Sequence, residues 1–375
     1  MRILHFLDTL NRGGAETLVL DVCRNAASAG FNIDFATSGG GPLLVDFERS
    51  GVDLFHLKRR LPFDPVLISG LRKLIRDRTI DIIHTHQAVD ALHALAAATG
   101  RPTRVVLTHH GIIPDRKNRL ALRFLIPRVA HNIVVGKSVK KDYEAELELQ
   151  FPTKTSVIYN GVDTKRLAPS GRDFRAELGI STAAPLIGMI GNFYPEARKD
   201  QMTLCRALPK VLAEFPDAHC VFAGQTMAGA ESKLAQCVKF CRENEIDGNV
   251  SFLGGRSDVP DILSALDVFV FSSFKEGLPI AVNEAMLAGV PIIVSDIEPL
   301  LEATANGEYG KVFPVKNAET LSDKILKLLR DDDLRQSLAE KAFQYASENF
   351  SIEAHLRELK KLYQSLLESG EKKGL

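Results

Sequence analysis

Short apolar runs rich in β-branched residues alternate with amphipathic helical patterns along almost the whole chain. Strands that alternate with helices form βαβ units, which build parallel sheets. The alternation therefore predicts an α/β protein. The predicted strands are ILHFLD (from Ile3), NIDFATS (Asn32), IDIIHTH (Ile80), RVVLTHH (Arg104), NIVVG (Asn132), TSVIYN (Thr155), LIGMIGN (Leu186), HCVFAGQ (His219), VSFLGG (Val250), VFVFSS (Val268), PIIVSD (Pro291) and GKVFPV (Gly310).

The pattern occurs twice, and both halves open with a strand, a glycine-containing turn, a helix and another strand. A chain of 375 residues also has the length of two ordinary domains. We therefore predict two Rossmann-like domains, residues 1–165 and 166–350, facing each other across a cleft. The boundary segment DTKRLAPSGRDFRAELG is polar and contains a proline. Residues 351–375 form one amphipathic helix, which we expect to cross back onto the first domain.

The composition excludes several classes of protein. Lys+Arg and Asp+Glu both total 47, so the net charge is zero, and a tail-driven nucleic-acid binder would be strongly basic. The five cysteines are widely spaced without a CxxC motif, which argues against a disulfide framework or a zinc knuckle. No apolar run reaches 18 residues and no signal peptide is evident. We expect a cytoplasmic chain that does not bind nucleic acid.

The most informative segment is SSFKEGLPIAVNEAMLAGVPIIVSD, residues 272–296. A strand ends, a loop carries Glu276, and Pro279 suits the first turn of a helix that contains Glu284. The free N–H groups at the start of such a helix, from Gly277 onward, can bind a diphosphate. Two carboxylates beside it can accept hydrogen bonds from sugar hydroxyls. Taken alone, the two glutamates are more often ordinary surface and helix residues.

The stretch EGLPIAVNEAMLAGVP resembles the donor-binding signature of the retaining glycosyltransferases of family four, which have the GT-B fold. The notable departure is Leu287, where that family commonly has alanine. The resemblance implies that Glu276 contacts the donor sugar, and that Gly277, Leu278 and Pro279 meet sugar and phosphate. It also implies that Glu284 binds the ribose of a nucleotide.

Two further segments fit the same family. IGNFYPEARKDQMTLCRAL, from Ile190, resembles its basic segment, in which Lys199 would neutralise the donor diphosphate. The family often has arginine where this chain has Asn192, and Arg198 is the cation that could compensate. LNRGGAETLVL, from Leu10, resembles the loop near donor phosphate and acceptor. Its candidate contacts are Gly13 and Gly14 on the donor side and Arg12 and Glu16 on the acceptor side; a Gly-Gly pair alone is more often a tight turn.

Four histidines follow two predicted strands, where ligands bind in open α/β sheets. His84 and His86 lie in IIHTHQ, and His109 and His110 lie in VLTHHG. No carboxylate accompanies them at ligand spacing, so a metal site is disfavoured. The resemblance favours His109 as the residue beside the transferred sugar, although the doubled histidine leaves His110 as an alternative. His84 and His86 either shape the acceptor side or pack structurally.

Two weaker matches complete the resemblance. Residues 160–163 read NGVD, which resembles the family's interdomain crossover and is also an ordinary turn sequence. Gly255 and Arg256 end a predicted strand near the expected nucleotide base. We expect Asp258 to cap the following helix.

Charge is unevenly distributed in the first half. From Arg101 to Lys141 there are ten Lys/Arg residues and one acidic residue, Asp115. Part of this stretch, DRKNRLALRFLIPR, is basic with an apolar side, which suits an anionic membrane surface. The alternatives are a solvated helix face and a site for a charged soluble acceptor.

The resemblance as a whole implies a retaining, metal-independent glycosyltransferase that uses a nucleoside-diphosphate sugar as co-substrate, without a cofactor. UDP-sugars are the commonest donors in that family. The expected acceptor is a glycan or a lipid-linked hydroxyl, in bacterial surface polysaccharide or lipopolysaccharide synthesis, with the protein peripheral on the inner face of the membrane. One alternative is a GT-B enzyme that acts on a soluble small molecule. Another is a non-catalytic nucleotide-sugar-binding protein.

Overall fold

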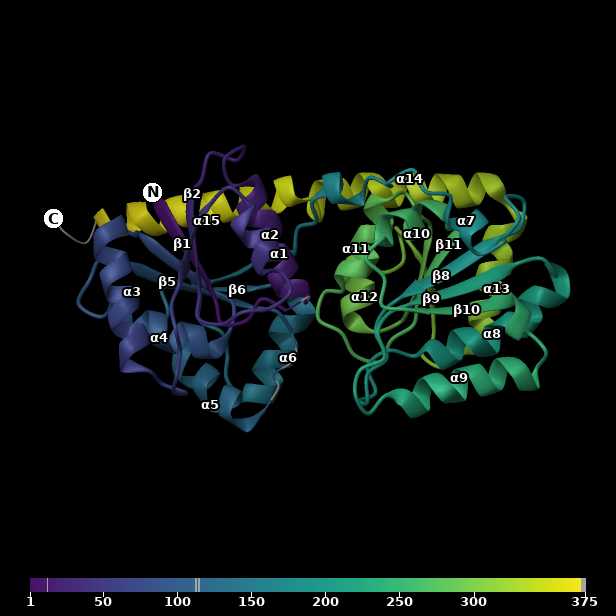
Figure 1. Ribbon diagram of the computed structural model, residues 1–375, viewed down its shortest axis with the longest axis horizontal. Coiled ribbons are helices and arrows are strands. Elements are labelled where there is room, and N and C mark those ends of the chain that lie inside the picture. The colour runs from purple at the N-terminus through teal and green to yellow at the C-terminus, as the bar shows by residue number, and fades with distance from the viewer. Residues whose placement is uncertain (12, 112, 114, 372–375) are drawn as a thin grey trace. The chain divides into compact units, whose positions relative to one another are not determined.

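The computed structural model describes residues 1–371 apart from 12, 112 and 114. The chain divides into two compact units (Figure 1). Unit 1 comprises Met1–Val162 and Asn349–Leu375, and unit 2 comprises Asp163–Glu348. The sequence prediction places these boundaries at 165 and 350. The C-terminal segment thus belongs to unit 1, because its apolar residues pack there.

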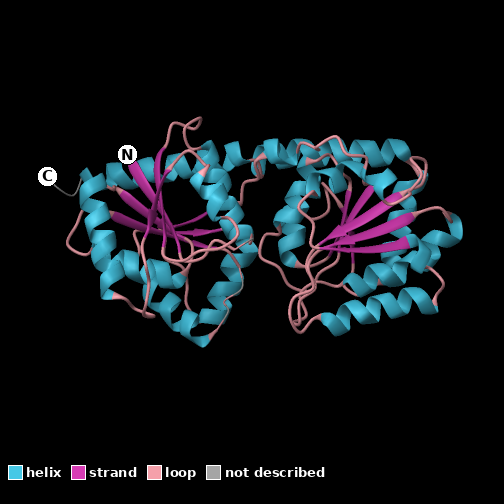
Figure 2. Ribbon diagram, viewed as in Figure 1, coloured by secondary structure: helices cyan, strands magenta, loops and turns pink. Residues whose placement is uncertain are grey.

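Unit 1 is built on a seven-stranded parallel sheet of order β3-β2-β1-β4-β5-β6-β7. Helices lie on both sides of this sheet (Figure 2). Its elements are β1 Arg2–Leu7, α1 Gly14–Asn25, β2 Asn32–Thr37, α2 Leu44–Glu48, β3 Asp53–His56, α3 Pro65–Arg78, β4 Ile82–Thr85, α4 Ala88–Ala98, β5 Arg104–His109, α5 Arg116–Leu125, β6 His131–Val134, α6 Lys137–Leu147, β7 Thr155–Val157 and α15 Ile352–Glu371.

Unit 2 has a six-stranded parallel sheet of order β10-β9-β8-β11-β12-β13, also covered by helices on both sides. Its elements are η1 Thr164–Leu167, α7 Phe174–Glu177, β8 Leu186–Ile190, α8 Gln201–Glu214, β9 His219–Ala223, α9 Glu231–Glu243, η2 Asp247–Asn249, β10 Val250–Gly254, α10 Val259–Ala265, β11 Val268–Phe271, α11 Ile280–Leu287, β12 Ile292–Ser295, α12 Glu298–Ala303, β13 Lys311–Phe313, α13 Ala318–Arg330 and α14 Asp332–Asn349.

Every predicted apolar run contains a strand, and the two parallel sheets confirm the predicted α/β class. The sequence reading missed β3, an edge strand whose residues are half-buried or exposed and therefore lack an apolar pattern. The turn after α1 ends on Gly30, which has a φ of 71°. There the Phe31 N–H donates to the Ala26 carbonyl and the Gly30 N–H to the Ala27 carbonyl, the Schellman arrangement that favours glycine.

Each unit has its own apolar core. In unit 1, Leu356, Leu359 and Tyr363 of α15 are buried with the apolar face of α1. Burying each such side chain stabilises the fold by roughly 1.5–3 kcal/mol. The five cysteines are buried and form no disulfide, which agrees with the prediction from their spacing. Among the described residues, no helix is both long and apolar enough to span a membrane.

The strand orders determine where side chains can converge. In unit 1 the chain builds outward from β1 to β3 and then returns to place β4 on the other side of β1. Unit 2 repeats this reversal at β8 and β11. The loops that follow the two central strands diverge at such a point, which leaves room for a ligand at the carboxyl edge of the sheet.

Candidate active site

The strand-order reversal of unit 2 brings Lys199 and Glu276 together. Lys199 lies in the loop after β8, and Glu276 lies in the loop after β11. The Lys199 ammonium lies 2.5 Å from Oε1 of Glu276, and the two side chains are 9% and 6% exposed. The Ser273 hydroxyl is also within hydrogen-bond distance of that carboxylate oxygen. A lysine and a glutamate far apart in the sequence therefore form one nearly dry ion pair.

The surroundings of Lys199 explain its electrostatics. Its ammonium lies 4.0 Å from the centroid of the Phe271 ring, a cation–π contact. Burial lowers the pKa of Lys199, and the attraction of the Glu276 carboxylate opposes that shift. An additional anionic group would enter a site that already contains the Lys199–Glu276 ion pair and the Ser273 hydroxyl.

The neighbouring residues support this loop. The Arg198 guanidinium lies 4.3 Å from the centroid of the Tyr194 ring, and its buried Nε has no hydrogen-bond partner among the described residues. The Arg198 carbonyl lies 2.6 Å from the Ser273 hydroxyl. Asn192 accepts a 2.9 Å hydrogen bond from the Gln225 N–H, which joins the loops after β8 and β9. Asn192 thus holds backbone, and the charge of Arg198 adds to the effect of burial in lowering the pKa of Lys199.

Helix α11 begins beside this pair. Pro279 is its N-cap residue, and the Pro279 side chain makes no capping hydrogen bond to the first turn. Gly277 and Leu278 lie in the preceding loop, with Leu278 buried. The uncapped helix start provides donors and a positive dipole end near Glu276, a suitable environment for a phosphate.

Glu284 follows within α11 and has a partner that sequence reasoning did not identify. Its carboxylate lies 2.7 Å from the Arg166 guanidinium, and the side chains are 12% and 26% exposed, respectively. Arg166 lies in η1, inside the polar segment interpreted as a linker. No motif marks this residue, so only the tertiary structure reveals the pair.

Arg256, which is predicted from the sequence to lie near the nucleotide base, forms ion pairs with two acidic residues. The Arg256 guanidinium donates to both carboxylate oxygens of Asp258 and, at 3.0 Å, to Glu177. These partners raise the pKa of Arg256 further above its ordinary value. Asp258 occupies the N-cap position of α10 but makes no side-chain cap hydrogen bond. The expectation that Asp258 caps the helix through its carboxylate was therefore wrong, because Arg256 binds that group.

In unit 1, the glycine pair begins α1. Gly13 is the N-cap residue and Gly14 the first helical residue. A Cβ atom at Gly13 would contact the Glu16 carboxylate, the far end of a flexible side chain, which would then have to shift. Glu16 is buried and accepts a 2.9 Å hydrogen bond from the Thr9 hydroxyl. Arg12, the other predicted contact, lies outside the described residues.

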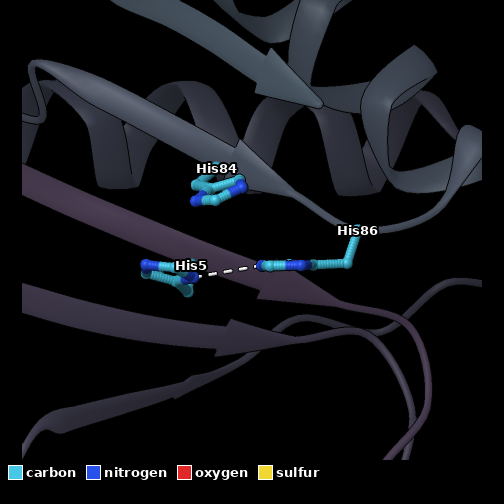
Figure 3. A group of neighbouring side chains, drawn as sticks. All are labelled: His5, His84 and His86. Carbon is cyan, nitrogen blue, oxygen red and sulfur yellow. Dashed lines mark hydrogen bonds between the residues drawn. The ribbon is translucent and has the colours of Figure 1, made fainter. Parts of the chain in front are cut away.

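Histidines gather at the strand-order reversal of unit 1 (Figure 3). His5 of β1 and His86, just after β4, are joined by a 3.1 Å hydrogen bond between Nδ1 and Nε2. His84 stacks on His86 with ring centroids 4.4 Å apart. Its Nδ1 lies 2.5 Å from the Tyr363 hydroxyl and its Nε2 lies 2.6 Å from the Thr108 hydroxyl. The sequence did not single out His5, although its position in the first strand could have indicated it.

The two neighbouring histidines of VLTHHG point to different surroundings. His109 ends β5, is 2% exposed, and hydrogen-bonds to Asn132 at 3.0 Å. Its ring contacts Tyr143 and Phe151 edge-on. His110 follows the strand and hydrogen-bonds through Nε2 to Nδ1 of His86 at 3.0 Å. His109 is thus packed in the unit, and His110 joins the histidines at the sheet edge.

An acidic pair that sequence reasoning missed lies beside the same edge. The Asp8 N–H donates to the Asp90 carboxylate at 3.1 Å, and Arg59 pairs with Asp8 at 3.2 Å. Burial raises the pKa of Asp90 well above its ordinary value, and the nearby Asp8 charge adds to the shift. One atom of each of these side chains is buried without a hydrogen-bond partner among the described residues.

The central part of the basic stretch forms α5, Arg116–Leu125. Leu120 and Phe124, one helical turn apart, are 61% and 46% exposed, whereas Leu122 and Leu125 are buried. The Arg128 guanidinium lies 4.2 Å from the centroid of the Phe124 ring. Arg119 pairs with Glu146, so part of the positive charge is already compensated. The helix presents apolar side chains among cations.

Comparisons with known proteins agree with this geometry. Residues 171–345 match the family model "Glycosyl transferases group 1", and residues 12–166 match "Glycosyltransferase Family 4". The chain is 24% identical over 373 residues to the N-acetyl-alpha-D-glucosaminyl L-malate synthase of Bacillus anthracis, covering 95% of this chain and 94% of that protein.

A second relative is the Escherichia coli UDP-Gal:alpha-D-GlcNAc-diphosphoundecaprenol alpha-1,3-galactosyltransferase, 26% identical over 354 residues and covering 89% of each chain. Among solved structures, Anabaena HepE in complex with UDP and glucose superposes with a TM-score of 0.82 at 19% identity. The superposition covers 97% of this chain and 100% of HepE. This likeness confirms the GT-B fold predicted from the sequence.

Proposed function

Because the chain belongs to the glycosyltransferases of family four, we propose that it moves a sugar from a UDP-sugar to a hydroxyl of a glycan or lipid-linked acceptor. UDP is favoured because the E. coli relative is named for UDP-Gal and HepE was solved with UDP. Unit 2 holds the donor in this proposal, and unit 1 presents the acceptor.

The observation that carries the proposal is the buried Lys199–Glu276 pair beside the uncapped start of α11. When the glycosidic C–O bond breaks, negative charge develops on the departing diphosphate. The Lys199 ammonium, the Arg198 guanidinium and the helix N–H groups stabilise that charge. Glu276 accepts hydrogen bonds from the sugar hydroxyls, and Glu284 accepts them from the ribose.

We further propose that the reaction retains the anomeric configuration and needs no divalent metal. The acceptor hydroxyl attacks the oxocarbenium-like carbon from the face that the diphosphate leaves, and a phosphate oxygen takes its proton. Protein cations fulfil the charge-neutralising role that a metal has in other transferases. Proton NMR of the product should show the anomeric configuration of the donor, and activity should persist in EDTA.

A donor panel tests the central proposal. The full chain is screened for a thermal shift with UDP-, GDP- and ADP-sugars, because ligands that bind the native state raise its apparent stability. Release of UDP is then measured with the sugar that binds. Glu276→Gln and Lys199→Gln should each lower turnover by about 10²–10³-fold, a loss expected when a preorganised transition-state contact is removed.

Lys210→Gln is the matched control, because Lys210 forms an exposed pair with Asp323 in the same unit. Near-normal turnover in Glu276→Gln or Lys199→Gln would exclude that residue from the site. Binding of a sugar nucleotide without any UDP release, across a panel of glycan, lipid-linked and small-molecule acceptors, would favour the non-catalytic alternative. Release with malate or another small molecule alone would favour a soluble acceptor, as in the name of the B. anthracis relative.

A lipid-linked acceptor also favours contact with a membrane. We propose that the exposed face of α5 binds anionic lipid, with Leu120 and Phe124 at the acyl boundary and the surrounding cations at the headgroups. This would place the protein peripherally on the inner face of the membrane.

Liposome flotation tests this contact. The protein should float with phosphatidylglycerol vesicles and not with phosphatidylcholine vesicles. Replacing Arg116, Lys117, Arg119 and Arg123 with Glu should abolish flotation, and Leu120→Asp should weaken it. Unchanged flotation in the charge-reversed protein would contradict the membrane proposal without affecting the donor proposal.

A further inference from the structure

His5, His86 and His110 form a line of hydrogen bonds at the strand-order reversal of unit 1, here called the histidine line. His5 Nδ1 lies 3.1 Å from His86 Nε2, and His86 Nδ1 lies 3.0 Å from His110 Nε2. We propose that this line fixes the tautomer of His110, so that His110 presents a protonated Nδ1 to an oxygen atom of the substrate. His5 and His86 are then positioning residues.

The argument begins with proton counting. Burial lowers the pKa of both His5 and His110 to about 3, so these rings are neutral at pH 7 and each carries one N–H. The pKa of His86 is also well below its ordinary value because of burial. His86 uses both ring nitrogens, so one donates and the other accepts. The protons of all three rings must therefore point in the same direction along the line.

The two directions leave different groups unpaired. If the protons point toward His5, its Nε2–H is left unpaired in a ring that is completely buried. If they point toward His110, His5 keeps a bare Nε2 and the unpaired N–H is Nδ1 of His110, which is also buried without a partner among the described residues. Either direction therefore leaves one buried N–H unpaired, and such a donor needs an acceptor. The two ends differ because His5 is completely buried within β1, whereas His110 is half-buried and follows β5 at the carboxyl edge of the sheet, so only the second direction leaves the N–H where a ligand can accept it.

The same rings could instead hold a metal ion. One nitrogen each of His5, His84 and His86 lies within 4.8 Å of the others. However, His84 and His86 are stacked at an interplanar angle of 24°, so their in-plane lone pairs do not converge on one point. Both nitrogens of His84 already lie at hydrogen-bond distance from hydroxyl groups. The geometry favours hydrogen bonds over coordination.

This inference rests on the proposed function only for the identity of the ligand. A fixed Nδ1–H is a hydrogen-bond donor, so it suits an oxygen of the sugar or of the acceptor. The opposite tautomer would present a bare nitrogen, which suits a base. The histidine line thus assigns His110 to orientation and charge stabilisation rather than to proton removal from the acceptor.

The tautomer can be measured without any activity. The full chain is labelled with 15N-histidine, and long-range proton–nitrogen correlation spectra at pH 7 distinguish protonated from bare ring nitrogens. His110→Gln identifies the His110 signals by their loss. We expect His110 with its proton on Nδ1. A proton on Nε2 of His110 in the unmodified protein would overturn the proposal.

Variants at His5 test whether the histidine line fixes the His110 tautomer. His5 does not touch His110 directly: it hydrogen-bonds to His86, which hydrogen-bonds to His110. His5→Phe removes the donor to His86 and should convert His110 to a mixture of tautomers, with kcat about tenfold lower and an unchanged Kd for UDP. His5→Asn keeps an amide donor near the position of Nδ1 and should restore both readouts. If the His110 tautomer is unchanged in His5→Phe, the proposal is overturned. If His5→Phe does not fold, the spectrum of the unmodified protein still decides which tautomer His110 adopts.

Cobalt(II) titration decides between the line and a metal centre. No new d–d absorption should appear when the ion is added to the full chain. Absorption bands that appear and are lost in His5→Phe would assign the three rings to metal binding and overturn the hydrogen-bonded line. Absence of UDP release in a protein that has the expected tautomer would contradict the proposed function alone.

Discussion

The Lys199 ammonium lies 2.5 Å from the Glu276 carboxylate, and the two side chains are almost fully buried. Their positions follow from the strand order of unit 2, because β8 and β11 are hydrogen-bonded neighbours. Removing one partner of a buried pair leaves the other charge uncompensated.

This relationship predicts an asymmetry between two lysines. Lys199→Met should lower the free energy of unfolding by about 3–5 kcal/mol, because Glu276 loses its partner in a dry site. Lys210→Met breaks an exposed pair with Asp323 and should leave the free energy of unfolding almost unchanged, because water already solvates both charges. Urea unfolding of the two variants measures the difference. Equal losses would show that Glu276 is well solvated or has another partner.

The Arg166–Glu284 pair predicts an effect on nucleotide binding. Glu284→Ala should weaken UDP binding by about 10–100-fold, since hydrogen bonds to charged groups contribute about 1.5–3 kcal/mol. Arg166→Met should weaken it less, because the carboxylate remains but loses its orienting partner. Isothermal titration with UDP measures both, with Arg330→Met at an exposed pair as control. UDP affinity unchanged in Glu284→Ala would remove the ribose contact from the proposal.

The buried histidines predict that acid destabilises the protein. Burial lowers the pKa of His109 from 6.5 to about 4. The unfolded chain therefore binds a proton between pH 6.5 and 4 that the native state does not, and stability falls as pH falls through this range. The loss is about 1.4 kcal/mol per pH unit for each such group.

Urea unfolding at pH 7, 6 and 5 checks this sign. His109→Gln keeps a partner for Asn132 and should reduce the slope of stability against pH. His56→Gln, at an exposed position, should leave the slope unchanged. A slope that does not differ between the unmodified protein and His109→Gln would mean that His109 is protonated in the native state too.

Gly161 packs closely against the segment with which the chain re-enters unit 1, so a side chain at this position should have a steric effect. A Cβ atom there would lie 2.6 Å from Cβ of His355 and 2.9 Å from Cα of Ile352. Gly161→Ala should therefore destabilise the protein by about 1–3 kcal/mol. Gly248→Ala is the control, because a Cβ atom at Gly248 meets nothing within 4 Å and the change should stay within about 0.5 kcal/mol. Thermal unfolding of both proteins compares them, and equal midpoints would refute the close approach.

Much of the fold was predictable because its signals are local. The period of apolar residues reports strands and helices directly, so the parallel strands of both units were located from short segments. Edge strand β3 was not, since an edge strand is only partly buried and needs no apolar run. The roles of Glu276, Glu284 and Lys199 came from contiguous motifs and remain predictions for experiment.

The sequence by itself determined the α/β class, the presence of two units, and the family to which the chain belongs, because periodicity and motif spacing are properties of neighbouring residues. Only the tertiary structure decided which charged and polar groups meet. Arg166 faces Glu284, and His5 faces His86, because strand order and register bring distant segments together. No local pattern encodes such pairings: they depend on burial and on the order in which parallel strands add to a sheet.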